Sequence, residues 1–496
     1  MFDILQGVAI SLAARRRQSM EPTNPIHALE VIGKREEKYS LLNNATSLSK
    51  LDWGLQAPKP KAWLLHREDV SSSRGVCEFS LPEIFPLFST LVGSNRDPLV
   101  VGFDKETVLQ NVRAVQKFRG SNEAWAEKFD ITLKAGWNVT VARERLAAIS
   151  DLSNYIQPIE YRAFDRRWIF YHTTLVWQMA PVCSKNVLDR AEGLVLVSLG
   201  KNRSETINGH WIVKSLADKA VVSGRDNASG FPLFIFSDGE LELHGQDKRA
   251  NFSNEFVRAL CQQLGDGSGA YGLPAGATPL RVVAYIYALL NSPGYRNHYA
   301  STLATGFPQV PLTSSLQLFK SLSNIGETLM AMHLLQIPKS NKPYTVYVGS
   351  TGVVIDKVSW SDGTVWIDKA QTAGFKGVPE IVWQYRIGDH QVCEKWLKAR
   401  GPKKGKPGRT LSKEDIAHYQ KIVVAISETI RIQKEIDEVI EAHGGWPGAF
   451  ATNAPPASEA SEPQAQPKAR NPKAAKAGEA GSEPGYIPDS GEIPFA

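Results

Sequence analysis

One stretch of the sequence, residues 280–290, is apolar on nearly every side that a helix could present. Thr278 is a good N-cap residue and Pro279 suits the first helical position, whereas Asn291-Ser292-Pro293 ends the pattern. A helix that is apolar all round must be covered on every side by other parts of the chain. The sequence therefore predicts a large folded domain built around this helix.

The other patterned stretches predict both helices and strands. Helix-prone segments lie at residues 106–118, 141–150 and 318–335. Apolar, β-branched and aromatic runs predict strands at residues 168–171, 194–197, 231–236, 344–348, 353–355 and 364–367. Ser361-Asp362-Gly363 reads as the turn of a hairpin. We therefore predict an α+β fold of mixed sheets and helices.

The C-terminal part of the chain predicts one long helix and then a tail. Ser412 and Asp415 stand at capping-box spacing, and Gly444-Gly445 ends the helix. A seam at 3-4-3-4 spacing contains Ile416, Tyr419, Val423, Ile426 and Ile430. It predicts packing within the chain or, alternatively, a dimer zipper. Residues 446–496 are rich in Ala, Pro, Glu, Ser and Lys, which predicts a disordered tail.

Composition narrows the class of protein only broadly. The net charge of +6 is compatible with an anionic partner such as nucleic acid, but many other proteins are equally basic. The four cysteines are far apart, and no Cys/His cluster has the spacing of metal ligands, so we expect reduced thiols and no metal site. The sequence has neither a secretory signal nor an apolar stretch that could span a bilayer, which predicts a cytoplasmic protein.

The motifs of common enzyme classes are incomplete in this sequence. Asn24-Pro25-Ile26-His27 lacks the second proline and the aromatic residue with which an amino-methyltransferase grips a flipped base. Gly200-Lys201 and Gly405-Lys406 each lack the earlier glycine and the hydroxyl residue of a phosphate-binding loop. We therefore assign no catalytic residue and expect the chain alone to catalyse nothing.

Several stretches in a fixed order resemble type ISP restriction–modification enzymes. They are residues 2–10 (FDILQGVAI), 33–39 (GKREEKY), 161–171 (YRAFDRRWIFY), 251–253 (NFS), 285–293 (YIYALLNSP), 307–312 (FPQVPL), 391–397 (QVCEKWL) and 418–422 (HYQKI). The first two are similar to the end of the family's adenine methyltransferase domain, and the others to its C-terminal specificity domain. The resemblance covers roughly residues 1–440.

The resemblance implies four regions and a role in recognising double-stranded DNA. Residues 1–70 would be a remnant of the methyltransferase domain, 71–395 the target-recognition domain, 396–445 a basic loop and helix, and 446–496 the tail. S-adenosylmethionine, ATP and Mg²⁺ would serve only the methyltransferase, motor and nuclease domains, which are expected as partners. Two alternatives remain: half of a split methyltransferase, or an inactive truncated protein or interaction scaffold.

Nine basic residues are candidate DNA contacts. Arg162, Arg166 and Arg167 could reach phosphates or guanine edges, although the same segment could be a strand in which Asp165 pairs with an arginine. The loop candidates, which could track the DNA backbone or form a flexible insertion, are Lys398, Arg400, Lys403, Lys404, Lys406 and Arg409. At the C-terminus, Ile493-Pro494-Phe495 is similar to the partner-recruiting tip of bacterial single-strand DNA-binding proteins, but Ala496 follows it, and a chance match is the alternative.

Overall fold

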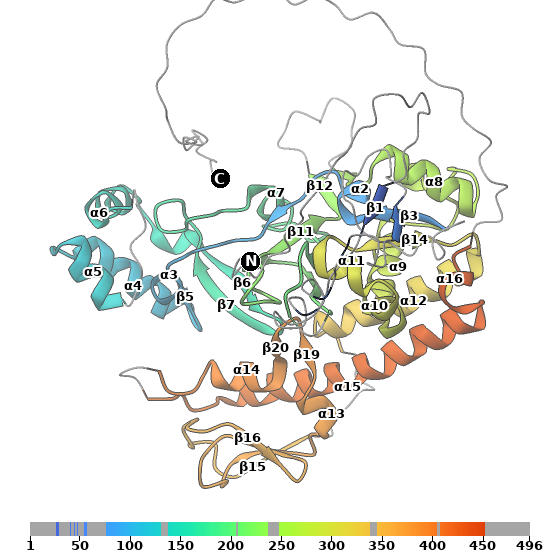
Figure 1. Cartoon of the computed structure of the whole chain (residues 1–496). Coiled ribbons are helices and arrows are strands. Elements are labelled where there is room, and N and C mark those ends of the chain that lie inside the picture. Colours follow the sequence, from blue (N-terminus) through green and yellow to red (C-terminus); the bar gives the residue numbers. More distant parts are fainter. Residues whose placement is uncertain are drawn as a thin grey trace, which may run out of the picture. The chain divides into compact units, whose positions relative to one another are not determined.

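The computed structural model describes residues 76–451, apart from 130–136, 205–206, 237–247, 338–344 and 404–406, together with residues 26–28, 40, 44, 47 and 54–56. In this part, helices and several small sheets are mixed along the chain, which confirms the predicted fold class (Figure 1). The predicted strand at residues 2–12 and the tail beyond residue 451 lie outside the described residues. Of the helices that are described, none is long and apolar enough to cross a membrane.

Three helices form the centre of the core: α9 (Pro279–Asn291), α12 (Leu316–His333) and α15 (Lys413–Ala442). As predicted, Thr278 caps α9 and every residue from Val282 to Asn291 is buried. α9 and α12 approach each other closely at Gly326. A Cβ atom at this position would lie 1.9 Å from the carbonyl oxygen of Ala284. Only glycine therefore permits this helix crossing without a shift of the backbone.

α15 packs within its own chain. Ser412 and Asp415 form the predicted capping box, and Tyr419, Val423 and Ile426 of the seam are buried. α15 contacts α9 and α12 as well as two short helices, α13 (Glu380–Trp383) and α14 (Val392–Lys398). The seam is therefore an intrachain packing surface. After α15, the short helix α16 (Gly445–Gly448) and the buried Phe450 belong to the same packing, although composition assigned residues from 446 onward to the tail.

The middle of the chain forms two four-stranded sheets. The first has the order β10-β6-β7-β5, with bounds Leu216–Ala217, Ile156–Arg162, Asp165–Phe170 and Val101–Gly102. The second has the order β4-β11-β8-β9, with bounds Ser89–Thr90, Ala228–Pro232, Val195–Leu199 and His210–Val213. The single strand predicted at residues 231–236 is wrong. The chain leaves β11 at Leu233 and starts β12 (Phe234–Phe236), which pairs with β13 (Lys248–Ala250) instead.

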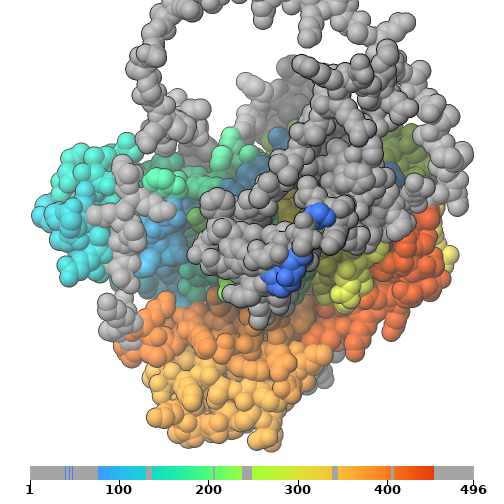
Figure 2. All heavy atoms as spheres, in the orientation of Figure 1, coloured from blue at the N-terminus to red at the C-terminus, as the bar shows by residue number. Residues whose placement is uncertain are grey.

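A third four-stranded sheet lies between α12 and α14 in the sequence. Its order is β15-β18-β17-β16, with bounds Val346–Val348, Gly374–Lys376, Thr364–Trp366 and Ser359–Ser361. The predicted hairpin is confirmed, and both Asp362 and Gly363 have the positive φ of a type I′ turn. The predicted strand at residues 353–355 is wrong, because only an isolated bridge joins Val354 to Thr410. Figure 2 shows this sheet as a separate lobe at the bottom of the view.

A helical arm carries the predicted helices near residues 106–118 and 141–150. It consists of α4 (Lys105–Lys117), α5 (Asn122–Phe129) and α6 (Val139–Ala147), and α4 packs on β7. The remaining elements are β1 (Ile26–Ala28), β2 (Gly54–Gln56), β3 (Cys77–Ser80), α2 (Leu81–Ile84), α3 (Asp97–Val100), η2 (Leu152–Tyr155), α7 (Pro181–Ser184), α8 (Asn254–Leu264), η4 (Ala270–Gly272), α10 (Pro293–His298), α11 (Ala300–Thr305), β14 (Gln309–Leu312), β19 (Arg386–Ile387) and β20 (His390–Gln391).

Candidate nucleic-acid interface

The β6–β7 hairpin holds the first group of candidate residues. Its turn consists of Ala163 and Phe164, and Phe164 has a φ of +62° and is buried against Trp211 and His333. The register shifts at Tyr161, so β6 has one residue more than β7 near the turn. The turn therefore points into the core, and the polar residues on either side of it are held in fixed positions.

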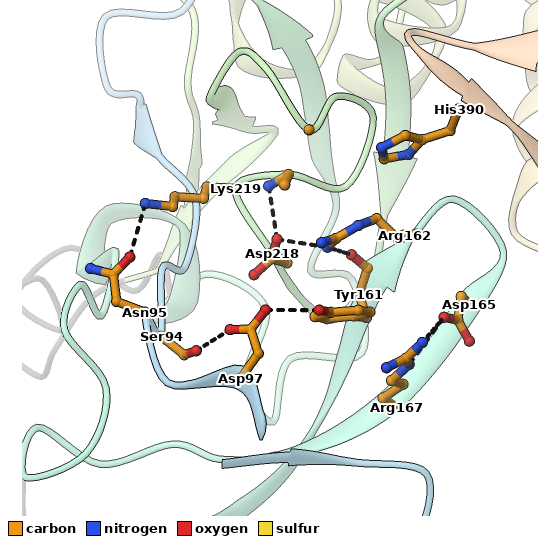
Figure 3. A network of polar contacts seen from close by, with 12 residues as sticks. Ser94, Asn95, Asp97, Tyr161, Arg162, Asp165, Arg167, Asp218, Lys219 and His390 are labelled. Carbon is orange, nitrogen blue, oxygen red and sulfur yellow. Dashed lines mark hydrogen bonds and ion pairs between the residues drawn. The ribbon is translucent and has the colours of Figure 1, made fainter. Parts of the chain in front are cut away.

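Tyr161 lies between two of the candidate arginines (Figure 3). The guanidinium carbons of Arg162 and Arg167 are 4.0 and 4.1 Å from the centre of its ring, one on each side. Arg162 Nη1 is 2.9 Å from Asp218 Oδ1, and the Tyr161 hydroxyl donates to Asp97 Oδ2 at 2.8 Å. Each cation thus has a nearby carboxylate as well as an aromatic face.

Asp165 joins the hairpin to the C-terminal segment. One of its oxygens is 2.6 Å from Arg167 Nη2, and the other is 3.2 Å from Arg400 Nη1. The side chains of both arginines are less than a tenth exposed, and Arg400 also lies over the Trp396 ring, at 3.4 Å. The ion pair expected for Asp165 is therefore present, and it occupies two of the nine candidate DNA contacts in the interior.

Four candidates lie at the surface: Arg166, Lys398, Lys403 and Arg409. The Arg166 side chain is 59% exposed and lies 3.7 Å from Glu160, its cross-strand neighbour. Lys398 is equally exposed and pairs with Glu394 on the same helix at 2.8 Å. The Arg409 guanidinium lies 4.6 Å from the ring centre of Phe103, on which Arg167 and Arg400 also stack. Lys404 and Lys406 lie outside the described residues.

A cavity of about 190 Å³ opens between the hairpin and α14. Three sequence-predicted residues, Arg162, Arg167 and Lys403, contribute to its wall. The other residues that line it are Tyr161, Ala163, Asp165, His390, Val392, Lys395, Trp396 and Ala399. Sequence reasoning missed Lys395 and His390, because more than 200 residues separate them from the hairpin. The sequence contained one indication of them: Lys395 lies within the stretch 391–397 that resembles the family, and His390 directly precedes it.

Burial shifts the pKa values of several groups around the hairpin. It raises the pKa of Glu160 to about 7, although the nearby charge of Arg166 acts in the opposite direction. Burial likewise raises the pKa of Asp218 to about 6, against the charge of Arg162. Burial lowers the pKa of His390 to about 3, so this imidazole is neutral near pH 7. Within the described ranges, no group of three His, Cys, Asp or Glu side chains could hold a metal ion.

Three solved structures share this fold. The ATP-dependent Type ISP restriction–modification enzyme LlaBIII bound to DNA has a TM-score of 0.55 and 16% identity, over 72% of this chain and 23% of that chain. A nuclease-deletion mutant of the Type ISP enzyme LlaGI with a DNA substrate mimic has a TM-score of 0.52 and 17% identity, over 85% and 33%. The DrdV–DNA complex has a TM-score of 0.57 and 19% identity, over 81% and 42%. The chain thus corresponds to less than half of each of these proteins.

No curated protein matches the sequence. Residues 83–435, however, match the family described as the Type ISP C-terminal specificity domain. This range contains the hairpin, the cavity, α9, α12 and most of α15, and it includes most of the stretches on which the sequence resemblance rests. The resemblance is confirmed: the chain belongs to the family of Type ISP C-terminal specificity domains.

Proposed function

We propose that this chain recognises a specific sequence in duplex DNA on behalf of a restriction–modification enzyme. The observation that carries the proposal is the family match over residues 83–435. The structurally similar LlaBIII, LlaGI and DrdV are all described in complex with DNA or a DNA mimic, which supports the same ligand here. Methyl transfer, ATP-driven movement and cleavage would require partner domains with their S-adenosylmethionine, ATP and Mg²⁺.

The exposed basic residues would contact two different parts of the DNA, the backbone phosphates and the bases. Lys398, Lys403 and Arg409 lie on or after α14, where they would neutralise backbone phosphates and fix the register of the protein on the duplex. Arg166 is different, because it is exposed on a strand whose neighbours are held by buried ion pairs. An arginine guanidinium can form two hydrogen bonds to one guanine, so the exposed Arg166 is our candidate for reading a base.

Selection from randomised duplexes would test the proposal. We expect an enriched sequence when the chain is combined with a methyltransferase domain of the same system, at near-physiological salt. Arg166→Gln should weaken binding to that sequence by about 1–3 kcal/mol and change binding to unrelated duplexes little. If a folded chain in this complex enriched no sequence, the proposal would be wrong, and the interaction-scaffold alternative would remain.

A further inference from the structure

The cavity beside α14 contains more hydrogen-bond donors than the surrounding residues use. Arg167 donates to Asp165 from Nε and Nη2, and its Nη1 has no hydrogen-bond partner among the described residues. Lys395 makes no hydrogen bond or ion pair within that same part of the chain. Burial and the nearby charge of Arg162 lower the pKa of Lys395. The charge of Asp389 acts in the opposite direction on this pKa, although Asp389 forms no ion pair with Lys395 among the described residues. Arg167 Nη1 and the Lys395 ammonium are thus two donors that the described residues leave unused.

The carboxylates around the cavity balance only part of this charge: Asp218 pairs with Arg162 at 2.9 Å, and Asp389 lies near Lys395. Arg162, Arg167, Lys395 and Lys403 line the cavity, and Asp165 is the one acidic residue among its lining residues. Both oxygens of Asp165 are already in contact with Arg167 and Arg400. Lys395 and Lys403 are exposed, whereas Arg162 and Arg167 are largely buried. An anion could therefore enter past the two lysines and reach the two arginines.

The aromatic residues of the wall argue against a nucleobase as the occupant. The Tyr161 ring already has two cations close to it, Arg162 at 4.0 Å and Arg167 at 4.1 Å from its centre. The ring of Trp396 has Arg400 at 3.4 Å and His418 stacked at 5.6 Å. A base would need an uncovered ring on which to stack. A phosphate needs only donors and positive charge, and a cavity of about 150 Å³ already holds a benzene ring, so about 190 Å³ is sufficient.

We propose that this cavity binds one phosphate group, with Lys395 and Lys403 at its mouth and Arg162 and Arg167 at its floor. The phosphate is either free or part of a nucleic-acid backbone. The second source rests on the function proposed above, whereas the first does not. In both cases the site fixes one anion beside the turn of the β6–β7 hairpin.

Calorimetric titration of the full chain with inorganic phosphate, at constant ionic strength, tests the site. We expect saturable binding to the wild type, at least tenfold weaker binding to Lys395→Gln, and unchanged binding to Lys421→Gln. Lys421 is the matched control, because it is an exposed lysine on α15 outside the cavity. Circular dichroism verifies that both variants fold. If the wild type did not bind phosphate, or if Lys395→Gln bound it equally well, the proposal would be overturned.

A second titration with duplex DNA present separates the two sources. Release of bound phosphate by the duplex identifies a backbone phosphate as the occupant, whereas simultaneous binding of both identifies a free phosphate. Failure of the phosphate site and failure of DNA recognition remain distinguishable. If the chain bound DNA but not phosphate, only the site would be lost. If it bound phosphate but no DNA, only the recognition function would be lost.

Discussion

The three-helix centre and the β6–β7 hairpin are both buried, but they are stabilised by opposite kinds of side chain. α9 is buried from Val282 to Asn291 and consists almost entirely of apolar residues. Around the hairpin, Arg167 and Arg400 are buried with Asp165, and the partly buried Arg162 pairs with the buried Asp218. An apolar core tolerates partial repacking, whereas a buried charge depends on specific partners. The stability of the hairpin region should therefore be more sensitive to the replacement of one charged side chain by a neutral one of the same shape.

The largest expected effect comes from removing the charge that the arginines share. Asp165→Asn leaves the buried Arg167 without its carboxylate and the buried Arg400 with only its longer contact to Asp415, at 3.5 Å, which should lower the free energy of unfolding by about 3–5 kcal/mol. Urea denaturation measures this loss. Glu394→Gln is the control, because it breaks only the exposed pair with Lys398 and should cost less than about 1 kcal/mol. Equal effects of the two variants would show that the buried ion pairs contribute no more to stability than the exposed pair.

The second largest effect is expected from adding one methyl group where α9 and α12 cross. Gly326→Ala places a Cβ against the carbonyl oxygen of Ala284 and should lower the free energy of unfolding by about 3 kcal/mol, because the contact is with backbone. Gly448→Ala is the matched control, since a Cβ there would meet nothing within 4 Å and no change beyond about 0.5 kcal/mol is expected. A tolerated Gly326→Ala would mean that α9 and α12 separate easily.

The same contrast explains what the sequence could predict. The apolar run of α9, the seam of α15 and the Asp362-Gly363 turn each have a periodicity or a turn requirement that local sequence expresses. The strand predicted at residues 231–236 was wrong because an apolar run does not show where the chain changes sheet. Long-range pairing of that kind depends on the whole fold.

The candidate site could be predicted only in part. The arginines of the hairpin were found from their segment, but nothing local distinguishes the exposed Arg166 from the buried Arg167 beside it. The partner Arg400 lies 235 positions from Asp165 in the sequence and was expected in a basic loop. Lys395 was missed for the same reason. Buried polar contacts depend on geometry that composition does not record.

The pH dependence of stability should have opposite signs in the two regions. The pKa of Glu160 is raised to about 7, so between about pH 4.5 and 7 the unfolded chain releases this proton first and stability falls as pH rises. In the helical centre, burial lowers the pKa of His333 to about 3, so stability falls as pH drops below about 6.5. Glu160→Gln should remove the fall in stability between about pH 4.5 and 7. At pH 8 the variant should be about 1–2 kcal/mol more stable than the wild type. Thermal unfolding at pH 5 and pH 8 measures the difference, and an unchanged slope would contradict the burial of this carboxyl.

The smallest effect on stability should belong to the exposed cations. Lys398→Gln removes one surface pair with Glu394, and the free energy of unfolding should fall by no more than about 0.5 kcal/mol. If Lys398 neutralises a phosphate of bound duplex, however, the same variant should reduce the slope of log affinity against log salt concentration by about 0.9. Lys421→Gln, with the same charge change elsewhere on the surface, should leave that slope unaltered. A variant that altered neither stability nor the salt slope would remove Lys398 from the DNA-binding surface. One that altered stability strongly would place it with the buried arginines of the hairpin, and the division between buried and exposed cations would no longer hold.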